Sequence, residues 1–102
     1  KAACEKVNPE IHVFTGRVVS GDQFIADDTK KQFLLTQFEP MCTEMEGAAI
    51  AQAEYLNKIP YLIIRAISDK ADGSAHMDYP AFEAAAITHT VNLVLELCAS
   101  LS

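Results

Sequence analysis

Three short polar clusters contain the residue types that do chemistry on small molecules. The first is SGDQFI at residues 20–25, the second is EME at 44–46, and the third is SDKAD at 68–72. Each cluster follows a stretch that is apolar or β-branched and is predicted to be a strand. Ligands of open α/β sheets bind outside the carboxyl ends of the strands. We therefore expect the three clusters to meet at one edge of a sheet.

Each cluster also has a purely structural interpretation. The SGD sequence at 20–22 is a common turn, and Phe24 taken alone fits a core position better than a ligand platform. Glu44 and Glu46 are two residues apart and would share one face of a strand, where they also favour the dipole of a helix that begins at 47. Asp69 after a buried strand could cap or turn the chain.

Arg65 is harder to explain by structure alone. It interrupts the apolar stretch YLIIRAI at 61–67, which is typical of a strand covered on both faces in a parallel sheet. A buried guanidinium needs an anionic partner. We expect that partner to be Glu44 or Glu46 on the neighbouring strand.

The elements that must position these residues alternate between strand and helix. The patterns predict strands at 11–19, 41–45 and 61–67, and helices at 30–38, 47–58 and from about 78 to 99. The helix at 47–58 is apolar on most sides and is expected to be buried. This order is typical of an α/β protein with a parallel sheet. Three strands are few for such a sheet, which predicts an incomplete domain.

Composition narrows the class of partner. The chain has 102 residues, a mass of 11.1 kDa and a net charge of -6, which argues against nucleic acid or an anionic membrane as the main partner. No uninterrupted apolar run reaches the roughly 20 residues of a membrane span. Cys4, Cys42 and Cys98 are odd in number and far apart, as expected of free thiols in a reducing cytoplasm. No Cys/His spacing predicts a metal site.

Taken together, the clusters resemble bacterial 5'-methylthioadenosine/S-adenosylhomocysteine nucleosidases. The resemblance rests on VSGDQFI at 19–25, EMEGAAIA at 44–51 and RAISDKAD at 65–72, and it covers about residues 10–100. The first two motifs occur across the nucleoside phosphorylase superfamily, whereas the third is more particular to the nucleosidases. The resemblance implies a three-layer αβα fold around a mixed sheet. It also implies a cytoplasmic homodimer in methionine salvage that has no metal or organic cofactor.

The resemblance places residues 1–102 in the carboxyl-terminal part of a single nucleosidase domain. The chain begins with Lys1 rather than Met, which agrees with a piece of a longer polypeptide. The amino-terminal half of such an enzyme supplies the glutamate that activates water and much of the 5' pocket. We therefore expect that activity needs this half as a partner.

The resemblance also assigns roles to single residues. The reaction is hydrolysis of the N-glycosidic bond, which releases adenine and a 5-thioribose product. Asp69 is implied as the general acid that protonates N7 of the leaving adenine. The sugar becomes oxocarbenium-like in such cleavages, and Glu46 is implied as the ligand of its 2'-hydroxyl. The implied substrate-binding residues are Phe24, Ile25, Met45, Glu46, Ser68 and Tyr79, and the supporting residues are Glu44 and Arg65. Tyr79 stands where the family often has Phe.

Three alternatives stay open. A purine nucleoside phosphorylase shares the fold but needs phosphate for turnover. A hydrolase of another adenine nucleoside, such as an aminofutalosine-type substrate, would differ mainly in the 5' pocket. A non-catalytic fragment or nucleoside-binding module is the third. The chain has no GxGxxG, Walker-type or GxSxG motif, which argues against dinucleotide-binding, P-loop and α/β-hydrolase proteins.

Overall fold

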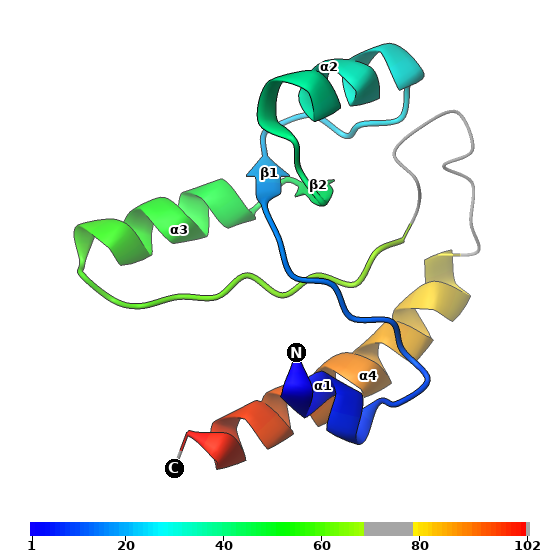
Figure 1. Ribbon diagram of the computed structural model, residues 1–102, viewed down its shortest axis with the longest axis vertical. Helices are drawn as coiled ribbons and strands as arrows, with labels where there is room; N and C mark the ends of the chain where they lie inside the picture. The colour runs from blue at the N-terminus through cyan, green and yellow to red at the C-terminus, as the bar shows by residue number, and fades with distance from the viewer. Residues whose placement is uncertain (69–78, 102) are drawn as a thin grey trace. The chain divides into compact units, whose positions relative to one another are not determined.

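The computed structural model describes residues 1–68 and 79–101 (Figure 1). The chain divides into two compact units, one of Lys1–Thr15 with Met77–Ser102 and the other of Gly16–His76. The first unit contains two helices, and the second contains a small parallel sheet with two helices. This combination confirms the α/β character predicted from the sequence.

In the first unit, α1 (Ala2–Val7) packs against α4 (Tyr79–Ser100). Asn8 follows α1 and is only 1% exposed. Its side-chain amide donates a hydrogen bond of 2.9 Å to the carbonyl of His89 on α4. Cys4 is buried in the same contact region. A buried polar side chain is stable only when it is hydrogen-bonded, so the Asn8 contact fixes how the two helices meet.

Helix α4 departs from the expectation that no segment could span a membrane. It has 22 residues, and within the described chain it is the one helix long and apolar enough to cross a bilayer by length and composition. Glu83 and Glu96 interrupt its apolar sequence. A core helix of a soluble protein passes the same test, so this property is weak evidence for a span.

In the second unit, β1 (Val18–Ser20) pairs in parallel with β2 (Cys42–Glu44). The chain between them forms α2 (Asp28–Phe38), so the three elements make a βαβ unit. The register places Ser20 opposite Glu44 at the carboxyl ends of both strands. Two of the predicted polar clusters therefore do meet at one sheet edge.

Both predicted helices of this unit form: α3 begins at the predicted residue 47, and α2 begins at Asp28, two residues before the predicted start. The carboxylate of Asp27 accepts the N–H of Lys30 at 3.0 Å and caps α2, and α2 ends at Glu39, which has a left-handed backbone (φ 48°). Helix α3 (Gly47–Leu56) packs on β1. Its predicted burial is wrong, because Tyr55 is 77% exposed. Within the second unit, sheet covers only part of the helix surface.

Two of the predicted strands are shorter than expected or do not form. Of the strand predicted at 11–19, only Val18 and Val19, with Ser20 beyond it, pair with a neighbour. The stretch at 61–67 is not a strand. An apolar sequence becomes a strand only when a second strand accepts its backbone hydrogen bonds, and none of the described residues does so. Its side chains are correspondingly open, with Leu62 70% exposed.

Candidate functional site

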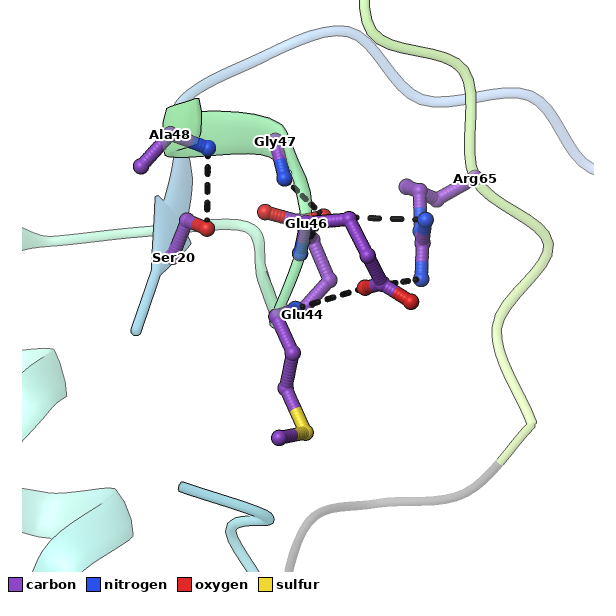
Figure 2. Close-up of polar contacts among 7 residues, drawn as sticks. Ser20, Glu44, Glu46, Gly47, Ala48 and Arg65 are labelled. Atoms are coloured by element: carbon purple, nitrogen blue, oxygen red, sulfur yellow. Dashed lines mark hydrogen bonds and ion pairs between the residues drawn. The ribbon is translucent and has the colours of Figure 1, made fainter. Parts of the chain in front are cut away.

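The candidate site is built around Glu44, the last residue of β2 (Figure 2). The Glu44 side chain is only 3% exposed. Its Oε2 atom accepts hydrogen bonds from the backbone N–H of Gly47 at 2.7 Å and of Glu46 at 3.1 Å. These N–H groups lie at the start of α3 and have no partner within the helix. The carboxylate therefore joins the end of β2 to the beginning of α3.

Ser20 supports the same corner from the neighbouring strand. Its hydroxyl oxygen accepts the backbone N–H of Ala48 at 3.0 Å, as Figure 2 shows. Ser20 belongs to the first predicted polar cluster, but the sequence does not predict that it caps α3. Its role follows from the parallel register, which sets Ser20 beside Glu44. Ser20 and Glu44 together accept the N–H groups of Glu46, Gly47 and Ala48 at the start of α3.

The surroundings of Glu44 favour its charged form. Burial by itself raises the pKa of this carboxyl group. The hydroxyl of Ser20, the N–H groups of Gly47 and Glu46, and the positive charge of Arg65 act in the opposite direction and prevail. The pKa of Glu44 therefore lies below its ordinary value, and the group is an anion at neutral pH.

Arg65 connects Glu44 to the second glutamate of the cluster. One guanidinium nitrogen, Nη1, lies 3.6 Å from Oε2 of Glu44, and the other, Nη2, lies 3.4 Å from Oε2 of Glu46. Figure 2 shows Arg65 reaching from its extended segment toward both carboxylates. The predicted pairing of Arg65 with Glu44 or Glu46 is therefore confirmed, and the structure shows that it involves both. The guanidinium is half-exposed rather than buried, because the segment that carries it is not covered.

Glu46 presents its carboxylate to solvent next to a backbone donor. Its side chain is 63% exposed, and its Oε2 atom accepts the N–H of Met45 at 3.1 Å. A carboxylate beside an N–H group offers one acceptor and one donor in adjacent positions. Such a pair can bind a ligand that carries neighbouring hydroxyl groups.

A cavity of about 450 Å³ opens beside this cluster. Ligand-binding cavities of small molecules have volumes of roughly 300 to 1,000 Å³. Five of its wall residues belong to the predicted site, namely Phe24, Ile25, Glu44, Arg65 and Ser68. The Phe24 ring is 65% exposed and is therefore free to contact a ligand face. Each of the three polar clusters thus contributes at least one described residue to this cavity, with Ser68 representing the third.

Cys42, which the sequence predicts only as a free thiol, also lines the cavity. Burial raises the pKa of its thiol, and the nearby charge of Glu44 raises it further, whereas Arg65 opposes both. The thiol is therefore protonated at neutral pH and makes an uncharged part of the wall. The alternation of side chains along β2 could have predicted this position, because Cys42 and Glu44 share one face.

The other predicted site residues are not among the described wall residues of this cavity. Met45 and Glu46 adjoin the cavity wall without forming part of it. Tyr79 is the first residue of α4 and belongs to the other unit. Asp69, the predicted general acid, lies outside the described residues, directly after Ser68. Across residues 1–68 and 79–101, no group of three His, Cys, Asp or Glu side chains is arranged to hold a metal ion.

Comparison with known families places the chain. Residues 1–99 match the Phosphorylase superfamily, and the chain therefore belongs to that superfamily. It is 41% identical over 87 residues to a 5'-methylthioadenosine/S-adenosylhomocysteine nucleosidase of Staphylococcus carnosus, covering 84% of this chain and 38% of that protein. A nucleosidase of the same name from Geobacillus sp. is 38% identical over 93 residues, covering 90% of this chain and 40% of that protein. These similarities confirm the resemblance to this group of nucleosidases.

A third relative carries a different name. The aminodeoxyfutalosine nucleosidase of Helicobacter pylori is 37% identical over 83 residues, covering 79% of this chain and 36% of that protein. The chain thus spans 36 to 40% of the length of these curated relatives. No solved structure gives a significant match.

Proposed function

We propose that the chain is the carboxyl-terminal part of a hydrolase that cleaves the N-glycosidic bond of 5'-methylthioadenosine and S-adenosylhomocysteine. The observation that carries this proposal is the cavity in which Phe24, Ile25 and Ser68 lie beside the Glu44–Arg65 pair. Similarity to nucleosidases of that name supports the choice of substrate. The three-layer αβα arrangement belongs to the same proposal.

Asp69 acts as the general acid in this proposal. Adenine is a poor leaving group as an anion, so its N7 must gain a proton as the C–N bond breaks. A carboxylic acid holds a proton at neutral pH only where its pKa is raised, as happens in a partly desolvated site. Asp69 follows Ser68, which lines the cavity, and this adjacency supports the role.

Glu46 and Met45 bind the ribose. The sugar gains positive charge as the bond breaks, and a carboxylate bound to its 2'-hydroxyl interacts more strongly with that charge than with the ground state. The Met45 N–H and the Glu46 carboxylate now bond to each other at 3.1 Å. Neighbouring sugar hydroxyls can replace that bond and satisfy both groups.

Phe24 and Ile25 bind the adenine. The exposed ring of Phe24 offers a face for stacking on the purine. The backbone of Ile25, in the same cavity wall, reads the edge of the base. Tyr79 lies near the sugar and the 5' group in this proposal.

The further parts of the proposal concern the whole protein. We propose that the amino-terminal half of the polypeptide supplies the base that activates water. The complete enzyme is a homodimer in the cytoplasm, serves methionine salvage and uses no cofactor. The extended segment at 61–68 has no strand partner among the described residues. We propose that strands from the amino-terminal half pair with this segment.

One specific observation favours a second substrate. The Helicobacter pylori relative, 37% identical to this chain, is an aminodeoxyfutalosine nucleosidase. The same acid and the same ribose ligands would serve that reaction, because the two kinds of nucleoside would differ at the 5' position. Competition between the two substrates in one assay ranks them by kcat/KM.

The experiment is adenine release from 5'-methylthioadenosine in phosphate-free buffer, followed on purified protein of recorded intact mass. The proposal predicts release without phosphate by the protein that contains both halves. It also predicts no release by the 102-residue chain alone. Release that requires phosphate would make the protein a phosphorylase. No release by the complete protein would leave a nucleoside-binding module.

A further inference from the structure

The carboxylate of Glu44 does more than fill the corner of the fold. A buried charge is costly unless several partners meet it. Here a single oxygen, Oε2, faces two backbone N–H groups at 2.7 and 3.1 Å and a guanidinium nitrogen at 3.6 Å. One of those N–H groups belongs to Glu46 itself. Glu44 therefore holds the main chain from which the Glu46 side chain extends.

The same arginine then holds the other end of Glu46. Arg65 lies between the two carboxylates and contacts each through a different nitrogen. The Glu46 side chain is exposed and has several rotatable bonds, and ordering such a side chain costs free energy. Its orientation is set at the backbone by Glu44 and at the carboxylate by Arg65 and the Met45 N–H. Loss of Glu44 would release the first of these contacts and leave Arg65 with one anion.

Gly47 leaves the room that this arrangement needs. A Cβ atom at position 47 would lie 2.5 Å from Oε1 of Glu44, which is shorter than a nonbonded contact, so the Glu44 carboxylate would have to move from its present position. The backbone of Gly47 does not have a positive φ, so the requirement is for space rather than for conformation. By contrast, a Cβ at Gly21 would meet nothing within 4 Å.

We propose that Glu44 is a positioning residue that orients the sugar-binding carboxylate of Glu46, and that Gly47 is the residue whose missing side chain allows it. This inference rests on the proposed function, because it gives Glu46 its ligand. Glu44 lines the same cavity, but we assign it no direct contact with the substrate. Its effect on the reaction passes entirely through Glu46, and this makes the effects of the two residues non-additive.

A double-mutant cycle on the protein that carries this chain tests the inference. Glu46→Gln is expected to lower kcat about 100-fold and Glu44→Gln about tenfold. The double variant is expected to match Glu46→Gln alone, because Glu44 has nothing left to position. A double variant about 1,000-fold slower than the wild type would make the two effects additive and overturn the proposal. Glu5→Gln, which removes an exposed ion pair, is the matched control.

A second readout is independent of catalysis. In the 15N-labelled protein, the amide protons of Glu46 and Gly47 are expected downfield because each donates to a carboxylate. Both should move upfield in Glu44→Gln and in Gly47→Ala, and neither should move in Gly21→Ala. Unchanged shifts in Glu44→Gln would overturn the inference. If the wild type releases no adenine, the proposed function fails, and the amide shifts alone then decide whether Glu44 holds the Glu46 backbone.

Discussion

The sequence predicts strands both in the corner around Glu44 and in the segment at 61–67, but in the structure only the corner contains strands. In the corner, β1 pairs with β2, and Ser20 and Oε2 of Glu44 accept N–H groups at the start of α3 within one unit, while Oε1 of Glu44 is buried without a hydrogen-bond partner among the described residues. The segment at 61–67 also has the apolar, β-branched sequence of a strand. It nevertheless remains extended and exposed, and Ile67 is 60% exposed. A helix start or a short parallel pair is determined by nearby residues. A central strand depends on neighbours that a sequence pattern cannot supply.

The largest effect is expected at the residue that follows the open segment. Asp69→Asn should lower adenine release by about 100-fold or more, because an amide cannot donate a proton as a carboxylic acid does. The fold should be retained, which circular dichroism can check. Steady-state release of adenine from 5'-methylthioadenosine is the measurement. Near-full activity of this variant would mean that Asp69 is not the general acid. The segment at 61–67 would then not position a catalytic residue.

The next largest effect is expected at Glu46, in the corner around Glu44. Glu46→Gln should lower kcat by about 100-fold and change KM much less, because the carboxylate acts on charge that develops in the transition state. Initial rates over a range of substrate concentrations separate the two constants. A higher KM with unchanged kcat would mean that Glu46 contributes only to ground-state binding.

A stability effect is expected at Glu44. Replacing this buried, charged acceptor by Gln should lower the free energy of unfolding by about 2 kcal/mol at neutral pH. The pKa of Glu44 is lower in the folded state than in the unfolded state. Its stabilising effect is therefore full above the unfolded pKa and is lost as pH falls through the folded one. Urea unfolding from about pH 7 down to about pH 3 measures the trend.

The expected result is a difference between wild type and Glu44→Gln that shrinks as the pH falls. A difference that stays constant over this range would mean that the charge of Glu44 does not contribute. Glu5→Gln again serves as control, since exposed helix ion pairs contribute only about 0.3 to 0.5 kcal/mol.

The smallest effect on stability is expected in the segment at 61–67, where Leu62→Ser tests whether the segment is covered. Leu62→Ser in the 102-residue chain should change the free energy of unfolding by no more than about 0.5 kcal/mol, because this side chain is already exposed. In a longer polypeptide that covers the segment, the same change should cost about 1.5 to 3 kcal/mol. Unfolding of the two proteins side by side tests this. Equal effects would mean that the segment stays open in both.

Much of the local structure could be predicted from single residues. The helices predicted at 30–38 and 47–58 correspond to α2 and α3, because caps and helix propensities act over a few residues. The pairing of Arg65 with the glutamates followed from charge alone. The strand at 61–67 and the burial of α3 could not be predicted, since both depend on surfaces that lie far away in sequence.

The candidate site shows the same division. Phe24, Ile25 and Ser68 were predicted from motifs, and they do meet at one cavity. Ser20 was missed because a serine in a turn motif gives no sign that its hydroxyl will cap a helix 28 residues later. The register of β1 against β2 supplies that information.

The central claim is that the N-glycosidic bond is cleaved by water rather than by phosphate. The most direct test is the mass of the sugar product formed from 5'-methylthioadenosine by the complete protein in saturating phosphate. The account predicts free 5-methylthioribose, formed at the rate measured without phosphate. A product that carries phosphate on the sugar, formed only when phosphate is present, would contradict it.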